Sequence, residues 1–200
     1  MAVAPKFAYA ILKAPAPVVH TLELYLDYTC PFSKKLFNQF YQNVFPVIQD
    51  KYPGKVQCIF RHQIQPWHPS STLVHEAALA VGLVAPEKFW EYSQILFNNQ
   101  SDFFDAAVLN ETRNQTYKRL ASLASPLAST DDIYSKLEIT NSSLNNGNKV
   151  TNDLKLHIKE ARLRSIHISP TVLFNGNVDN SISSGWSVDQ WQEWLGKNIV

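Results

Sequence analysis

The chain has 200 residues, of which 45% are hydrophobic and 18% are charged, and its formal net charge is +1. This composition is that of a folded protein and excludes a disordered chain. The near-neutral charge gives no electrostatic reason to expect a nucleic acid or an anionic membrane as a partner. The only cysteines are Cys30 and Cys58, so a disulfide-stapled framework of the secreted kind is also excluded.

Residues 1–20 are predicted to form an N-terminal arm, with an extra edge strand around residues 7–12. A weak apolar stretch lies between Lys6 and Lys13, and an alternating Ala-Pro run follows it over residues 14–17. This pattern matches neither a secretory signal peptide nor a membrane span. The expected location is therefore the reducing cytoplasm.

The next three segments follow a strand, helix, strand pattern. Residues 21–28 alternate apolar and polar side chains, which is the period of a strand with one buried face. Residues 31–50 change to helical spacing, and residues 55–61 return to a strand after the Pro53-Gly54 turn. A helix between two strands indicates a right-handed βαβ crossover, so the first third of the chain is predicted to be α/β.

Cys30 stands where the first of these strands gives way to the helix. Pro31 suits the first helical turn, which places the thiol at the helix N-terminus, where backbone N–H groups and the helix dipole stabilise a thiolate. Cys30 is therefore the candidate nucleophile. Ser33 is predicted either to donate a hydrogen bond to the Cys30 sulfur or a ligand, or to be a solvated hydroxyl near the helix cap.

Neither Ser33 nor Cys58 offers an obvious second thiol for Cys30. The strand that carries Cys58 predicts a buried, unreactive thiol. Cys58 could act as a distant resolving thiol only if the fold brought its sulfur within disulfide geometry of Cys30. A lone thiolate must wait for an outside thiol, for which glutathione is the natural candidate.

Residues 61–69 are predicted to form an irregular loop at the end of the second strand. Loops that leave the carboxyl ends of strands line the ligand crevice of α/β sheets, so this loop could border Cys30. His62 and His68 are auxiliary candidates, as a base or as a positive charge near the thiolate, although loop histidines are commonly just solvated. No metal site is expected from these two and His75, because their spacing matches no familiar pattern.

A helical block and a return to the sheet complete the chain. Residues 71–125 show helical periodicity throughout, and two more helices are predicted over 130–138 and 150–164. We expect this block to be an insertion packed over the sheet, with five aromatic side chains in its core. They are Phe89, Trp90, Phe97, Phe103 and Phe104.

The final segment is predicted to be a strand over residues 166–174, a hairpin turn at Asn175-Gly176 and a helix capped by Ser187. Pro170 interrupts a ladder of hydrogen bonds, so it is expected at a strand start, edge or bulge, or after a cis peptide bond.

This order of elements resembles the thioredoxin-like fold with a DsbA-type helical insertion. The resemblance extends to the cis-proline strand Ser169-Pro170-Thr171-Val172 and to several runs of the first insertion helices. These runs are Phe60-Arg61-His62, His68-Pro69, Glu76-Ala77-Ala78, Lys88-Phe89-Trp90-Glu91-Tyr92 and Leu96-Phe97-Asn98-Asn99-Gln100. It implies a thioredoxin-like domain over 21–68 and 165–200 and an inserted helical domain over 69–164.

By this resemblance Cys30 is the nucleophile, and Pro170 is cis and faces it. Ser169 offers a strand-like backbone edge to a peptide or to glutathione. The further residues expected at this binding site are Pro31, Phe32 and Thr171.

Two departures from the family pattern stand at Ser33, where the second cysteine is usual, and at Leu24, where a buried acid is often found. Glu23 is expected on the opposite face of the strand.

The expected function is a DsbA-like thiol–disulfide oxidoreductase that acts through one thiol, without a bound cofactor and with glutathione as co-substrate. A protein or peptide disulfide would be the partner. One alternative is a transferase or isomerase, because Cys-Pro-Phe-Ser also resembles the Ser-Pro-Tyr-Ser of kappa-class glutathione transferases and hydroxychromene-carboxylate isomerases. The other is a non-catalytic module that binds a peptide at the cis-proline edge.

Overall fold

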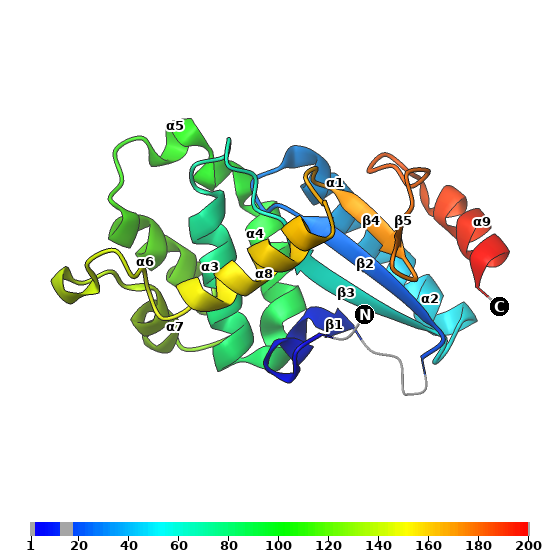
Figure 1. The fold of residues 1–200 in the computed structure, drawn as a ribbon, viewed down its shortest axis with the longest axis horizontal. Coiled ribbons are helices and arrows are strands. Elements are labelled where there is room, and N and C mark those ends of the chain that lie inside the picture. The colour runs from blue at the N-terminus through cyan, green and yellow to red at the C-terminus, as the bar shows by residue number, and fades with distance from the viewer. Residues whose placement is uncertain (1–2, 13–17, 200) are drawn as a thin grey trace.

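A computed structural model of the chain describes residues 3–12 and 18–199. It confirms the predicted α/β architecture, with a mixed sheet flanked by helices (Figure 1). The strands are β1 (Ile11–Leu12), β2 (His20–Leu26), β3 (Val56–His62), β4 (Thr171–Phe174) and β5 (Asn177–Val178). The helices are α1 (Pro31–Gln39), α2 (Phe45–Lys51), α3 (Ser71–Val84), α4 (Phe89–Asn98), α5 (Asp105–Val108), α6 (Arg113–Leu123), α7 (Thr130–Leu137), α8 (Thr151–Leu163) and α9 (Val188–Asn198).

The five strands form one sheet in the order β1-β3-β2-β4-β5. β2 and β3 are parallel, with Leu22 opposite Cys58 and Leu26 opposite His62, as the predicted βαβ crossover requires. The other three pairings are antiparallel. The β4–β5 pair confirms the hairpin predicted at Asn175-Gly176, where both residues have positive φ.

β2 is buried on both faces, whereas its alternating sequence predicted one polar, solvated face. Glu23 and Tyr25 of β2, and Asp27 directly after it, are all fully buried. β2 lies between β3 and β4, and strands inside a sheet that is covered on both sides lose their solvated face. Glu23 is charge-paired there with Arg61, at 2.6 Å, and with Arg164, at 2.8 Å. The acid on the opposite face from Leu24 is therefore part of a buried ion cluster.

The helix predicted over 31–50 is divided. A π-helical segment, Phe40–Val44, separates α1 from α2. Pro46 lies in the first turn of α2 and has no N–H to donate to the preceding turn, which explains the wider turn before it. Six residues in this region still belong to the buried core: Leu36, Phe37, Phe40, Val44, Phe45 and Ile48.

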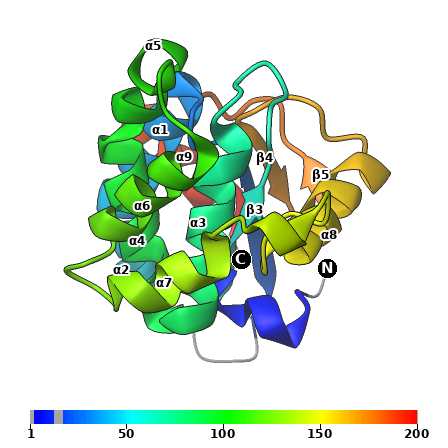
Figure 2. The same cartoon turned by 90° about the vertical axis from the view of Figure 1, so that its left-hand side faces the viewer.

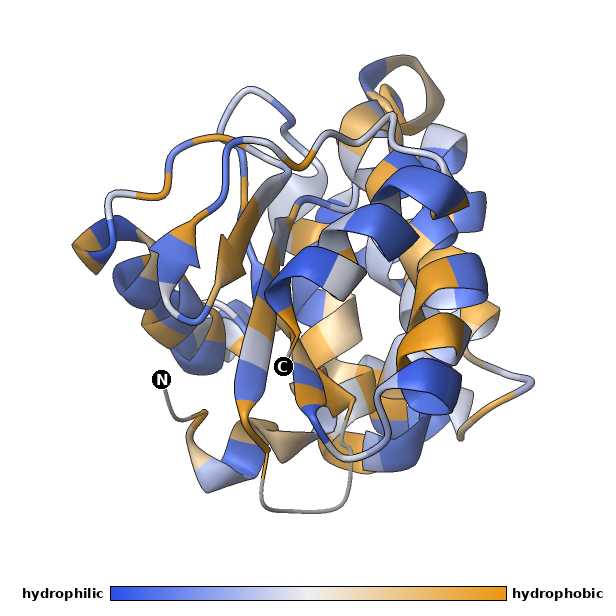
Figure 3. Cartoon of the chain, turned by 90° about the vertical axis from the view of Figure 1, so that its right-hand side faces the viewer, coloured by the Kyte–Doolittle hydropathy of each residue, from blue (hydrophilic) through white to orange (hydrophobic). Residues whose placement is uncertain are grey.

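The helices between β3 and β4 form a block at one end of the sheet, and α8 crosses the sheet against β3 (Figures 1 and 2). One hydrophobic cluster runs through the sheet and this block, so the two predicted domains share their core. Figure 3 shows hydrophobic and hydrophilic residues alternating along the helices, as expected where one side of each packs inward. Phe104 is an exception to the predicted aromatic core, because it is 38% exposed.

The N-terminal segment packs on α3 rather than forming a long edge strand. Residues Pro5–Ala10 make 3-10 turns, and of the described part of this segment only Ile11–Leu12 pair with β3. The ring of Tyr9 lies so close to Gly82 that a Cβ on that glycine would be 2.5 Å from it. The Ala-Pro run over residues 14–17 lies outside the described residues.

The strand predicted over 166–174 is shorter in the structure, because β4 begins only after Pro170. The helix cap predicted at Ser187 is confirmed, and it forms a capping box with Gln190. Within the described residues no helix is both long and apolar enough to cross a membrane.

Candidate thiol site

Cys30 occupies the N-cap position of α1, directly after the turn that ends β2. Its backbone is extended, and its carbonyl oxygen accepts the first helical hydrogen bond, from the N–H of Lys34. The thiol Sγ lies 3.4 Å from the carbonyl oxygen of Ser169, and the Ser169–Pro170 peptide bond is cis. The structure therefore brings together residues 139 positions apart that the resemblance placed at one site.

The residues predicted to bind substrate differ in exposure. Phe32 is 64% exposed on the first turn of α1, and Pro31 is also exposed. Ser169, Pro170 and Thr171 are half-buried. Cys30 itself is only 6% exposed, so a partner sulfur can reach it over only a small part of its surface.

Ser33 does not take either of the positions predicted for it. Its side chain is fully buried, and its Oγ accepts a hydrogen bond of 3.2 Å from the backbone N–H of Asp27. It is therefore neither a solvated hydroxyl nor bonded to the Cys30 sulfur. Its hydrogen bond instead links α1 to the residue that follows β2.

Cys58 is buried, as predicted, and it lies at the far end of the sheet from Cys30. It pairs in register with Leu22 of β2, whereas Cys30 follows the last residue of that strand, Leu26. Four residues of strand separate these levels, about 13 Å at roughly 3.3 Å per residue. Both cysteines are free, and this separation is too large for a disulfide between them.

Asp27, three residues before Cys30, was missed as a site residue because its alternation in the sequence assigned it to a solvated face. It is fully buried, and its Oδ1 accepts hydrogen bonds from the N–H and hydroxyl of Thr29 and from the hydroxyl of Ser71. Its Oδ2 accepts from the N–H of Gln65 and lies 3.0 Å from His68 Nδ1. Burial alone would raise the pKa of Asp27, but hydrogen bonds from His75, His68 and Thr29 lower it well below its usual range.

His62 was predicted to lie in a loop that borders Cys30. In the structure it is instead the last residue of β3 and is buried inside the protein. Its Nδ1 lies 2.7 Å from Nδ1 of His75, and its ring lies 4.7 Å from that of His157. Burial, together with the positive potential of these neighbours and Arg61, lowers the pKa of His62 well below its usual value. The sequence could not show that three histidines distant in the chain would meet.

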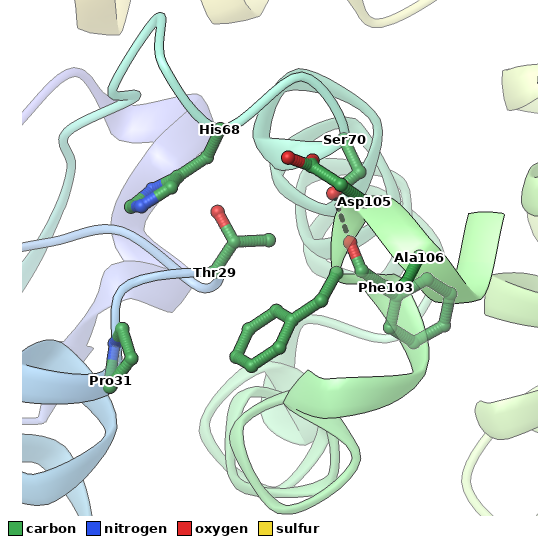
Figure 4. Close-up of a pocket in the computed structure, with 8 residues that line it drawn as sticks. Thr29, Pro31, His68, Ser70, Phe103, Asp105 and Ala106 are labelled. Atoms are coloured by element: carbon green, nitrogen blue, oxygen red, sulfur yellow. Dashed lines mark hydrogen bonds between the residues drawn. The ribbon is translucent and has the colours of Figure 1, made fainter. Parts of the chain in front are cut away.

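His68 does border the thiol site. It lines a cavity of about 350 Å³ together with Thr29 and Pro31, the residues on either side of Cys30. Figure 4 shows these three on one side of the cavity, with Phe103 and Asp105 on the other. Phe104, the aromatic residue wrongly predicted to be core, also lines it.

Gln100 ties the helical block to the loop that carries the thiol. Its side-chain amide donates to the carbonyl oxygens of Tyr28, at 2.6 Å, and Cys30, at 2.9 Å.

Among the described residues, no cluster of histidine, cysteine or acidic side chains is placed to hold a metal ion.

The comparisons with known proteins identify the class to which this fold and site belong. A family model described as Thioredoxin matches residues 13–197, so the chain belongs to that family. Its fold is the thioredoxin-like fold with a DsbA-type helical insertion, as seen in thiol–disulfide oxidoreductases. A search of curated proteins returned no match.

Three solved structures illustrate the likeness. A candidate protein-disulfide isomerase from Pseudomonas syringae is 25% identical, with a TM-score of 0.73 over 96% of this chain and 99% of its own. Oxidised BdbD from Bacillus subtilis is 23% identical, with a TM-score of 0.62 over 94% and 91%. DsbA from Chlamydia trachomatis is 16% identical, with a TM-score of 0.61 over 98% and 92%.

Proposed function

We propose that this protein catalyses thiol–disulfide exchange on protein or peptide disulfides through Cys30 alone. The observation that carries the proposal is the position of the Cys30 sulfur, at a helix N-cap and 3.4 Å from the backbone of Ser169. In this position helix N–H groups can stabilise a thiolate, and the backbone before Pro170 can hold an extended peptide. The solved structures of oxidoreductases with this fold support the assignment.

In the first step the Cys30 thiolate attacks one sulfur of the substrate disulfide. A mixed disulfide forms, and the other substrate sulfur leaves as a thiolate. Ser33 and the distant Cys58 provide no nearby sulfur for the second step. An external thiol therefore attacks the substrate sulfur of the mixed disulfide and releases Cys30 in its reduced form.

Glutathione is our candidate for this external thiol, and its use would place the protein in a reducing compartment such as the cytoplasm. A transferase in which Ser33 orients a glutathione sulfur receives less support, because that hydroxyl is buried against the backbone of Asp27. Peptide binding without exchange remains the alternative outcome of the test below.

The test compares Cys30→Ala with Cys58→Ala in an assay that follows reduction of a peptide disulfide by glutathione. We expect Cys30→Ala to abolish turnover and Cys58→Ala to retain most of it, because only the first thiol can reach substrate. Intact-protein mass spectrometry should show a peptide adduct on Cys30 after an acid quench. Equal losses in both variants, or peptide binding without any adduct, would refute the exchange mechanism.

A further inference from the structure

Asp27 and His68 form a pair near Cys30, and neither residue has a role in the exchange steps described above. Asp27 Oδ2 lies 3.0 Å from His68 Nδ1. The Asp27 side chain is completely buried, whereas that of His68 keeps 26% of its surface exposed. The pair thus runs from the interior of the protein to the wall of the cavity beside the thiol.

The surroundings of Asp27 determine which nitrogen of His68 carries the proton. Besides the histidines, the groups that hydrogen-bond to this carboxylate are N–H and O–H donors of Gln65, Thr29 and Ser71. An ionised carboxylate can only accept, so His68 Nδ1 must be protonated and donate to it. In the neutral ring, Nε2 then holds a free lone pair that can accept a proton. A buried acid fixes the histidine tautomer in the same way in Ser-His-Asp sites.

The cavity lets an incoming thiol lie beside His68 and against the residues next to Cys30 in the chain. Its walls include the residues that flank Cys30, and its volume of about 350 Å³ is sufficient for a small molecule. The titratable groups around His68 are Asp27, which its ring contacts, and Asp105 across the cavity, while the buried His75 lies 3.7 Å from the other oxygen of Asp27.

We propose that His68, held by Asp27, is the general base for the external thiol that releases Cys30. This inference rests on the proposed function. A free thiol is mostly protonated at neutral pH, because its pKa is about 8.5, and only the thiolate attacks a disulfide. A base in the cavity supplies that thiolate where it is needed.

The step is balanced as follows. His68 Nε2 takes the proton of the incoming thiol while its sulfur forms a bond to the substrate sulfur of the mixed disulfide. The bond from that sulfur to Cys30 breaks, and its electron pair stays on Cys30 as a thiolate. The imidazolium then returns the proton to Cys30 or to water. His68 is thus a catalytic residue, and Asp27 is a positioning residue that fixes its tautomer.

The experiment isolates this step. In the full chain with Cys58→Ala, Cys30 is first converted to its mixed disulfide with glutathione. Excess 2-mercaptoethanol is then added, and the loss of the adduct is followed by acid quench and intact mass over a range of pH. Mass also distinguishes release of free Cys30 from attack on Cys30 itself, which would leave a mercaptoethanol adduct.

We expect His68→Gln to slow release about 100-fold at pH 7, within the usual range for general-base catalysis. The difference should shrink at high pH, where the added thiol ionises without help. His167→Gln is the matched control, because that imidazole is exposed and outside the cavity. Asp27→Asn should slow release at pH 7 as well, since it no longer fixes the tautomer.

The parent protein provides a second, variant-independent measurement. Its release rate should fall less steeply between pH 8.5 and 7 than the thiolate fraction of 2-mercaptoethanol. A tenfold fall per pH unit in the parent, or identical pH profiles for the parent and His68→Gln, would overturn the role of His68 and leave the exchange function intact. If no adduct forms on Cys30, the exchange function fails and the base with it.

Discussion

Three histidines in the interior show how strongly the pKa of a single side chain depends on its surroundings. Burial is the largest cause that lowers the pKa of His62, His75 and His157, the last to about 3. Because the Nδ1 atoms of His62 and His75 lie 2.7 Å apart, one of them must donate a hydrogen bond and the other must accept it. The folded protein therefore holds this cluster neutral at pH values where free imidazoles already bind protons.

This cluster predicts a loss of stability in mild acid. In the unfolded chain the histidines titrate near their free pKa of about 6.5, whereas in the folded chain they stay neutral. Below about pH 6.5 the unfolded state therefore binds more protons, and stability falls as the pH falls, by up to about 1.4 kcal/mol per pH unit for each such histidine. Above that pH this contribution is constant.

Urea unfolding at pH 8, 6 and 5 measures this slope. His157→Phe, which keeps a ring against Phe7, should reduce the slope by about one proton, whereas replacement of the exposed His167 by Gln should not change it. Asp27, whose pKa is lowered, adds a similar loss only below about pH 4. A stability that stays level down to pH 5 would contradict the neutral cluster.

Sequence reasoning located the thiol residues better than their partners. Cys30 could be found because a strand, a proline and a helical period meet at that position. Asp27 could not, because its contacts with His68 and Ser71 cross more than 40 residues, with nothing local to signal them. Ser33 was misplaced for a related reason, since its burial depends on the turn that folds over it.

At the scale of the elements, the first turn of α1 carries Cys30 at its N-cap and Ser33 three residues later. Side chains three residues apart on a helix are neighbours, with Cβ atoms about 5–6 Å apart, whereas a disulfide needs about 3.5–4.5 Å. A modest adjustment of the turn would therefore let a thiol at residue 33 reach Cys30, although the sequence supplies a hydroxyl there.

Ser33→Cys should convert the site into one that resolves itself. With a neighbouring thiol, release of a mixed disulfide on Cys30 becomes intramolecular, so it should no longer require an external thiol. Loss of the hydrogen bond from Asp27 should cost about 1 kcal/mol of stability. The measurement is adduct lifetime by mass spectrometry without added thiol, with Ser33→Ala as the control. An equally long-lived adduct in both variants would show that residue 33 cannot reach the Cys30 sulfur.

The same contrast between local and distant causes applies to the elements. The hairpin at Asn175-Gly176 and the cap at Ser187 were predicted correctly because a few adjacent residues specify them. The π-helical break at Phe40–Val44 and the late start of β4 were not. Both depend on the backbone hydrogen bonds that a proline cannot make, Pro46 at the start of α2 and Pro170 before β4.

At the scale of the whole molecule, the N-terminal segment, the sheet and the helical block share one core. Two helical glycines test how tightly that core is packed. A Cβ on Gly82 of α3 would meet the Tyr9 ring at 2.5 Å, whereas a Cβ on Gly196 of α9 would have only the Tyr52 hydroxyl nearby, at 3.8 Å.

We expect Gly82→Ala to destabilise the protein by about 1–3 kcal/mol, because the N-terminal segment must move to make room. Gly196→Ala should instead stabilise it by up to about 1 kcal/mol through helix propensity. Urea unfolding of both variants measures the difference. A second change, Tyr9→Ala, should remove most of the added penalty of Gly82→Ala. If it does not, contact with the N-terminal segment is not the cause.

The burial of Cys58 has a practical consequence for the molecule as a whole. Burial raises the pKa of this thiol, and its side chain has no exposed surface, so a thiol reagent can reach it only when β3 comes away from its neighbours. Its labelling rate therefore measures how often the sheet opens, as amide hydrogen exchange does for a backbone group. In one sample, the labelling rate of Cys30 then reports reaction at the site and that of Cys58 reports opening of the core. Each rate serves as the internal standard for the other.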